Sequence, residues 1–267
     1  MNQSNKNKLV LITGASSGIG AATAQKLASE GMRVILVARR KDKLTALVEQ
    51  INSRGGIAYC YASDLSMSEN CILLANTIKT ELGIPDVLIN NAGIGWYGYF
   101  SQMPWQITQE MLSLNIEAAT HLTSLLLPEM QKLNRGHIIF VGSIMGKMPE
   151  QGVAVYSASK AYLDAFSKSI YRDLRGTPLS ISILRAGPVK TNFFDNAAAY
   201  ENGGRIPAEN IAISPDKIAE KVLSLINHPR RFIYVPFYTI VTPLLETFFS
   251  WLLDIIGPIL LRKTQKT

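Results

Sequence analysis

The sequence is poor in the residues that hold metals and disulfides. It has two cysteines, Cys60 and Cys71, and three histidines that form no cluster. Neither set has the spacing of a zinc site, and the two cysteines do not suggest a disulfide framework. We therefore expect no metal site and a reducing compartment, the cytoplasm.

The sequence also lacks an apolar leader and a high content of charge. Residues 1–8 are polar, so we expect no N-terminal signal peptide or membrane anchor. Charged residues make up 18% of the chain and hydrophobic residues 47%, which argues against disorder and allows a large buried core. Lysine and arginine outnumber the acidic residues by 27 to 20, which favours a phosphorylated ligand or an anionic membrane surface as a partner. No feature supports binding to nucleic acid.

Short β-rich runs alternate with stretches of helical period, and no repeat or low-complexity linker divides the chain. The expected strands are 8–13, 33–37, 57–61, 86–90, 137–141, 179–184 and 231–235. The expected helices are 20–29, 43–52, 68–82, 107–133, 153–174 and 215–227. This order predicts a doubly wound α/β fold, in which helices cover both faces of a parallel sheet of about seven strands and ligands bind at the carboxyl ends of the strands.

The same pattern predicts the organisation of the chain. We expect one Rossmann-type domain over residues 1–235, followed by an apolar helical extension over 236–267 that is not an independent domain. Residues 190–213 form a long connection between a strand and a helix, which is typical of a lid or binding loop.

A glycine-rich segment follows the first expected strand and leads directly into a helix. It reads Thr-Gly-Ala-Ser-Ser-Gly-Ile-Gly from Thr13 to Gly20. Glycines let the backbone turn sharply and approach a pyrophosphate, whose charge is favoured by the amides at the N-terminus of a helix. The segment predicts a dinucleotide site, and a tight turn without a ligand is the structural alternative. Its expected cofactor-binding residues are Gly14, Ser16, Ser17, Gly18, Ile19 and Gly20.

No acidic residue stands at the end of the second expected strand, where folds specific for NAD bind the ribose hydroxyls. The chain reads Arg39-Arg40-Lys41 there. A basic cluster attracts a 2′-phosphate, and an arginine can contact it through two hydrogen bonds. We therefore expect NADP(H) as cofactor, with Arg39 as the main contact and Arg40 as a weaker candidate. A solvated start of a helix is the alternative.

A tyrosine and a lysine four residues apart begin the helix that follows the fifth expected strand. Tyr156 and Lys160 would lie on one helix face. Carbonyl reduction needs a hydride from a nicotinamide and a proton for the developing alkoxide, and a phenol with a pKa of about 10 transfers a proton poorly near neutral pH. A cation stabilises phenolate, so we expect Lys160 to lower the pKa of Tyr156. Ser143, at the end of the preceding strand, would hold the substrate oxygen.

These motifs resemble those of the short-chain dehydrogenase/reductase family over about residues 8–235. The set Asn115, Ser143, Tyr156 and Lys160 is similar to the family's catalytic tetrad in order and placement. The resemblance implies that Lys160 also bonds the nicotinamide ribose and that Asn115 binds a water linked to Lys160. It further implies cofactor contacts at Asp64, Leu65, Asn91, Ala92, Gly93, Val189 and Thr191. Ala186 departs from the family pattern, which has a proline before Gly187.

The chain is strongly apolar after residue 231, although prolines interrupt it. Its longest proline-free part, 244–257, is shorter than the roughly twenty residues that cross a bilayer. Glu246, Ser250 and Asp254 would form one narrow polar stripe on an otherwise apolar helix. Basic pairs at 230–231 and 262–263 would suit anionic headgroups, which favours peripheral membrane contact, while burial against a second subunit of a homo-oligomer explains the tail nearly as well.

The expected substrate follows from the aromatic residues near the site and from the tail, which resembles that of membrane-associated reductases of lipids and steroids. The aromatic residues are Trp96, Tyr97, Tyr99, Phe100, Phe193 and Phe194. We expect an oxidoreductase that transfers a hydride between NADP(H) and a ketone, aldehyde or secondary alcohol of hydrophobic or lipidic character. A non-catalytic dinucleotide-binding sensor or membrane scaffold is the alternative, but binding alone does not need Tyr156.

Overall fold

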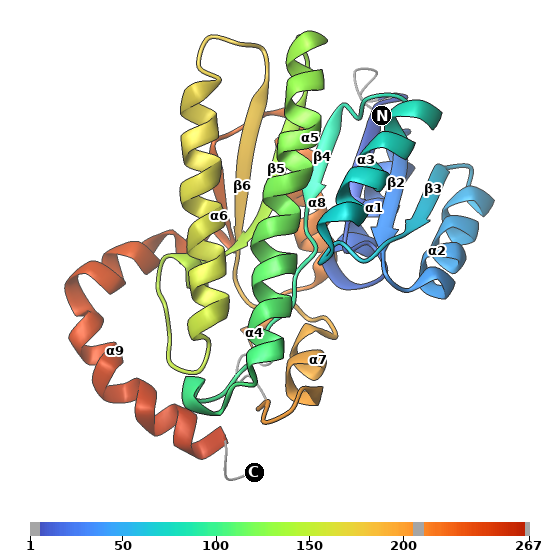
Figure 1. Cartoon of the computed structure of the whole chain (residues 1–267). Coiled ribbons are helices and arrows are strands. Elements are labelled where there is room, and N and C mark those ends of the chain that lie inside the picture. The colour runs from blue at the N-terminus through green and yellow to red at the C-terminus, as the bar shows by residue number, and fades with distance from the viewer. Residues whose placement is uncertain (1–5, 205–210, 265–267) are drawn as a thin grey trace.

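A computed structural model describes residues 6–204 and 211–264, except for the side chains of residues 253 and 256–264 (Figure 1). At its centre lies a parallel sheet with the strand order β3-β2-β1-β4-β5-β6-β7. The strands are β1 (Leu9–Thr13), β2 (Arg33–Ala38), β3 (Ile57–Ala62), β4 (Val87–Asn90), β5 (His137–Ser143), β6 (Ser180–Ala186) and β7 (Phe232–Val235). The prediction of a parallel, Rossmann-type sheet of about seven strands is confirmed.

Helices connect the strands and cover both faces of the sheet (Figure 1). They are α1 (Gly18–Ser29), α2 (Lys41–Ser53), α3 (Ser68–Glu81), α4 (Trp105–Leu112), α5 (Ala118–Lys132), α6 (Ala154–Asp173), α7 (Phe193–Ala199), α8 (Pro215–Asn227) and α9 (Thr242–Thr264). Short 3-10 turns are η2 (Phe100–Gln102), η4 (Ile144–Gly146) and η6 (Phe237–Val241), and η3 (Ser113–Glu117) is a π-helix.

Two hydrophobic clusters show why this sequence folds into layers. Successive residues of a strand point to opposite faces, and in β1 Val10 joins one cluster while Leu11 joins the other. The first cluster packs the sheet against α1, α2 and α8, and the second packs it against α3, α5 and α6. All five residues of β1 are buried. A strand covered on both faces reads as a continuous apolar run, which is why the strands were visible in the sequence.

The structure differs from the predicted elements in two segments. The helix expected over 107–133 is divided into α4, the π-helix η3 and α5, and Asn115 lies in η3. π-Helical turns occur often at functional sites because they displace a side chain from its regular position. The connection expected over 190–213 contains the short helix α7, and its residues 205–210 lie outside the described part of the chain.

Parallel strands place all their carboxyl ends at one edge of the sheet, which we call the carboxyl edge. The glycine-rich loop follows β1 there, Asn91 follows β4, Ser143 ends β5, and the segment from Gly187 to Thr191 follows β6. After β7 the chain continues at this edge through η6 into α9, which curves around the side of the molecule where α6 lies (Figure 1). No helix in the described part of the chain is long and apolar enough to cross a membrane.

Candidate active site

The glycine-rich loop after β1 has the shape of a phosphate cradle. Gly14 and Gly18 have positive φ angles of 65° and 56°, a region that favours glycine. A Cβ atom at Gly14 would lie 2.8 Å from Ala92 Cα, and one at Gly18 would lie 2.9 Å from Thr191 Cγ2. Ser17 occupies the N-cap of α1 without a side-chain capping bond, so its side chain does not occupy the first amides of the helix. The loop therefore fits a dinucleotide pyrophosphate.

Thr13 and Asn91 hold this loop against the end of β4. The Thr13 hydroxyl oxygen accepts hydrogen bonds from the backbone amides of Asn91 and Ala92, both at 3.0 Å. In return, Asn91 Nδ2 donates to the Thr13 carbonyl oxygen at 2.8 Å. The Asn91 side chain thus fixes the loop, while Ala92 and Gly93 line the cavity beside it.

The two arginines after β2 lie in different places. Arg39 Nη1 forms an ion pair with Glu110 Oε1 at 2.8 Å, and the Arg39 side chain is half exposed. Arg40 Nη2 donates to the hydroxyl oxygens of Ser16 and Ser17 at 2.9 and 2.8 Å. Arg40, expected to be the weaker candidate, is therefore the arginine that touches the glycine-rich loop. Arg39 can bind a 2′-phosphate only if its guanidinium contacts the phosphate and Glu110 together or if its ion pair with Glu110 breaks.

Asp64 and Leu65 follow β3 and do not line the cavity in the described structure. Asp64 Oδ1 accepts hydrogen bonds from the backbone amide and the hydroxyl of Ser66, and the Asp64 carbonyl oxygen accepts one from Asn70. Leu65 is buried. These bonds shape the turn into α3, and contact of the pair with adenine stays a prediction.

Ser143, Tyr156 and Lys160 meet at the carboxyl edge. Tyr156 and Lys160 lie one turn apart in α6, and the Tyr156 hydroxyl is hydrogen-bonded to Ser143 at the end of β5. Lys160 Nζ donates to the Val141 carbonyl oxygen at 3.1 Å and lies 5.7 Å from the centre of the Tyr156 ring. The three side chains that the sequence predicted to act together are thus adjacent and line one cavity.

Asn115 stands behind this group in the π-helix and is fully buried. Its Oδ1 accepts from the Ile94 amide at 2.9 Å, and its Nδ2 donates to the Ile94 carbonyl oxygen and to the Ser159 hydroxyl. A Cβ at Gly93 would lie 3.0 Å from Asn115 Oδ1 and 3.6 Å from Lys160 Nζ, so glycine keeps the space between them open. Oδ1 retains a second lone pair for the water that the family resemblance implies.

Burial moves the pKa values of the catalytic pair in opposite directions. It raises the pKa of Tyr156 to about 12, although the hydrogen bond with Ser143 acts against this rise. It lowers the pKa of Lys160 to about 8. Burial disfavours the charged form of each group, and in the protein alone this effect exceeds the expected stabilisation of phenolate by Lys160. The Tyr156 phenol is therefore protonated at neutral pH and can donate.

The segment after β6 closes the other side of the site. The Val189 backbone pairs with Ile213, and the Thr191 hydroxyl accepts from the Phe193 amide at 3.3 Å. The Phe193 ring lies 5.5 Å from the Tyr156 ring, between centres. Val189 and Thr191 line the cavity, and their contact with a nicotinamide stays a prediction, while Phe193 forms an apolar wall beside the phenol.

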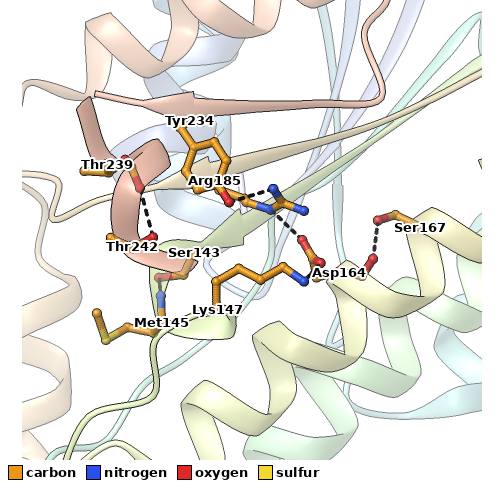
Figure 2. A network of polar contacts seen from close by, with 9 residues as sticks. All are labelled: Ser143, Met145, Lys147, Asp164, Ser167, Arg185, Tyr234, Thr239 and Thr242. Atoms are coloured by element: carbon orange, nitrogen blue, oxygen red, sulfur yellow. Dashed lines mark hydrogen bonds and ion pairs between the residues drawn. The ribbon is translucent and has the colours of Figure 1, made fainter. Parts of the chain in front are cut away.

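A buried ionic network ties the elements around the site together (Figure 2). Asp164 on α6 pairs with Lys147, which follows η4, and accepts from Arg185 Nε at 2.6 Å. Arg185, near the end of β6, also donates to the Tyr234 hydroxyl at 2.8 Å and lies 4.6 Å from the centre of the Phe232 ring. No local pattern in the sequence indicated this network, although Asp164 stands one helical turn after Lys160.

The cavity at this edge has a volume of about 1090 Å³. Its walls include Trp96, Met145, Met148, Val153 and Phe194, which are apolar or weakly polar. Glu246, Ser250 and Asp254 of α9 also line it. The polar stripe predicted from the sequence thus faces the cavity, which no periodicity could show. The cavity is large enough for a nicotinamide and a sizeable substrate.

Comparison with known proteins agrees with this geometry. The chain matches the family model described as short chain dehydrogenase over residues 8–202. It therefore belongs to the short-chain dehydrogenase family and is an oxidoreductase of that family. It is 33% identical over 222 residues to the uncharacterized oxidoreductase YbbO of Escherichia coli strain K12, a match that covers 80% of each chain.

Solved structures of this family resemble the chain closely. A short-chain dehydrogenase from Sphingobium yanoikuyae in complex with NADPH has 26% identity and a TM-score of 0.79, with 88% of this chain and 90% of that chain covered. A metagenomic short-chain oxidoreductase in complex with NADP has 34% identity and a TM-score of 0.70, with 83% and 91% covered.

Proposed function

We propose that the protein transfers a hydride between NADP(H) and a ketone or aldehyde, or the matching secondary alcohol. The observation that carries this proposal is the meeting of Ser143, Tyr156 and Lys160 in a cavity that also contains Gly14 and Gly18 of the cradle. The choice of NADP(H) is supported by Arg39 and Arg40 in place of an acidic residue, and by the bound NADPH and NADP of two similar structures.

Each side chain has a defined task in reduction. Bound NADPH would supply the hydride to the carbonyl carbon. The Ser143 hydroxyl holds the carbonyl oxygen by donating a hydrogen bond, and the Tyr156 hydroxyl gives its proton to that oxygen as the alkoxide forms. Lys160, when charged, stabilises the phenolate left behind, and Asn115 holds a water through which the proton is replaced. Oxidation of an alcohol uses the same groups in reverse.

The substrate that fits best is hydrophobic or lipidic, because Met145, Met148, Val153 and Phe194 line the cavity. We further propose a cytoplasmic protein that is a homo-oligomer and contacts a membrane at its periphery. The exposed apolar side chains after β7 support such a contact. A non-catalytic sensor of dinucleotides has less support, since it would not need a phenol in the cavity wall beside a buried lysine.

A panel of ketones and aldehydes of increasing chain length, assayed with NADPH, tests the proposal. We expect consumption of NADPH with at least one substrate and a higher kcat/KM for longer chains. A Tyr156→Phe variant serves as the matched control for turnover. If no carbonyl compound is reduced and no secondary alcohol is oxidised with NADP, the proposed reaction is wrong.

A further inference from the structure

The segment from η6 to Ile255 of α9 has two faces of opposite character. On the inner face, Glu246, Ser250 and Asp254 line the catalytic cavity. They are spaced four residues apart, so they follow one side of the helix. The backbone of Phe249 departs from helical geometry, with φ of −129° and ψ of 17°. This kink bends the helix and accompanies its curved path around the molecule (Figure 1).

The outer face of the same segment is apolar and exposed. More than half of the exposed large apolar side chains in the described part of the chain lie between residues 237 and 255. We define the outer apolar face by six of them, each exposed by 58% or more: Phe237, Tyr238, Leu244, Phe248, Trp251 and Ile255. A contiguous set of such residues marks an interaction surface, because monomeric proteins in water rarely expose one.

The distribution of charge favours an anionic lipid surface as the partner. Residues 237–255 contain no lysine or arginine, and their two acidic residues line the cavity. In the sequence after Asp254 the charged residues are Arg262, Lys263 and Lys266, and the chain as a whole carries +7. Anionic headgroups attract such a chain, whereas the same net charge gives a second copy no attraction to this face. Aromatic side chains such as Tyr238 and Trp251 are also the ones favoured at a membrane–water interface.

The basic pair at 230–231, which the sequence predicted to contact anionic headgroups, does not lie beside α9. Arg231 stacks on Tyr171 near the C-terminal end of α6, with its Cζ 5.6 Å from the ring centre. β7 separates Arg231 from η6, and its four residues span about 13 Å. The pair at 230–231 therefore stands at the opposite edge of the sheet from η6 and does not flank α9. The attraction therefore rests on the net charge of the chain and on the basic residues that follow Asp254 in the sequence.

We propose that the outer apolar face of η6 and α9 rests in the headgroup boundary of an anionic membrane, while the inner polar face forms a wall of the catalytic cavity. One helix then joins the lipid surface to the active site. A lipidic carbonyl compound can then pass from the bilayer along α9 into the cavity that contains Tyr156. The passage of substrate rests on the proposed reaction, whereas the docking to the membrane does not.

Flotation of the full-length protein with vesicles tests the docking. Vesicles of equal parts phosphatidylglycerol and phosphatidylcholine are compared with pure phosphatidylcholine at low and high salt. We expect binding to the anionic vesicles that weakens with salt, and at least tenfold weaker partition for the Phe248→Ser/Trp251→Ser variant. The matched control is Ile72→Ser/Leu73→Ser, which removes two exposed apolar side chains from α3 and should float like the wild type.

Two further measurements separate the possible outcomes. Light scattering detects a dimer: if the wild type stays off anionic vesicles and the Phe248→Ser/Trp251→Ser variant converts a dimer to a monomer, the surface is a subunit interface and the proposal is wrong. Equal flotation of this variant and the wild type also overturns it. Turnover of a short, water-soluble carbonyl compound with NADPH should be unchanged in the variant. Failure of all turnover would refute the proposed reaction and leave the flotation result to decide the docking.

Discussion

The catalytic edge between β1 and β6 and the segment after β7 differ in how they are held. At the edge, Asn115 and Lys160 are buried and bonded to backbone groups of other elements. In the segment after β7, Phe248 and Trp251 face outward and only one side of α9 meets the cavity. Both regions line the same cavity. The catalytic edge is held by the packed core, whereas α9 covers the cavity from outside and is exposed on its other side.

This difference assigns different tasks to the two regions. Proton transfer needs atoms held within a fraction of an ångström, and only a packed core holds them so. Recognition of a substrate chain tolerates a wall that is less tightly packed. We therefore expect substitutions at the edge to abolish cofactor binding, stability or turnover, and substitutions in α9 to alter substrate preference.

The largest effect on cofactor binding should follow from filling the phosphate cradle. Gly18→Val places a β-branched side chain at positive φ and presses its Cβ against Thr191 Cγ2. We expect the affinity for NADPH, measured by fluorescence titration, to fall at least a hundredfold. Gly83→Val is the control, since Gly83 also has positive φ but has nothing within 4 Å of its Cβ position. Equal losses in both variants would show that backbone strain, not the cradle, is responsible.

Breaking the buried ionic network should cause the largest loss of stability. Asp164→Asn leaves Lys147 and Arg185 without their carboxylate, and loss of one partner of a buried pair typically costs about 3–5 kcal/mol. We therefore expect Asp164→Asn to lower the free energy of unfolding, measured by urea denaturation, by about 3–5 kcal/mol. Glu129→Gln removes the carboxylate of an exposed pair with Lys132 and should cost about 1 kcal/mol or less. Similar costs for the two variants would contradict the role given to the network.

The two arginines after β2 allow a finer comparison within the edge. Arg39→Ala and Arg40→Ala should each weaken NADPH binding about tenfold, and NADH binding much less, because a charge-assisted bond is worth about 1.5–3 kcal/mol. Glu110→Gln should strengthen NADPH binding, since it releases Arg39 from its ion pair. Arg54→Ala, after α2, is the control. Isothermal titration with both cofactors measures these effects, and equal losses of NADPH and NADH would refute the phosphate contact.

The smallest effect is expected in α9. Glu246→Leu makes the wall that α9 contributes to the cavity more apolar and should lower KM for a long-chain carbonyl compound a few-fold, which corresponds to about 1 kcal/mol. Its kcat should stay within about twofold of the wild type, because Glu246 does not touch the catalytic pair. Glu220→Leu, exposed on α8, controls for the change of charge. A large loss of kcat in Glu246→Leu would place α9 in the catalytic machinery.

The sequence predicted the elements whose signals are local. The central strands were visible because two-sided burial makes them continuously apolar, and Tyr156 and Lys160 were visible because a spacing of four places them on one helix face. The π-helix at Asn115 could not be predicted from the sequence, because the same residues also fit a regular α-helix. Nor could the sequence show that Arg39 pairs with Glu110, because contacts between distant segments depend on the packed fold.

The position of α9 illustrates the same limit. Its polar stripe was evident from the spacing of Glu246, Ser250 and Asp254, but the partner of that stripe depends on the path that the chain takes after β7. The predicted direction of the Tyr156 pKa shift was also wrong, because only the structure shows that desolvation of the phenol outweighs its other interactions. Position in the fold, rather than residue type, decided each of these cases.

The most direct test of the central claim is a single-turnover measurement on Tyr156→Phe. This variant keeps the ring that packs on Phe193 and loses only the hydroxyl. With NADPH bound and a reducible ketone in excess, we expect the rate of NADPH oxidation to fall about a hundredfold to ten-thousandfold, while NADPH affinity stays within about twofold of the wild type. An unchanged rate of NADPH oxidation would contradict the assignment of Tyr156 as the proton donor.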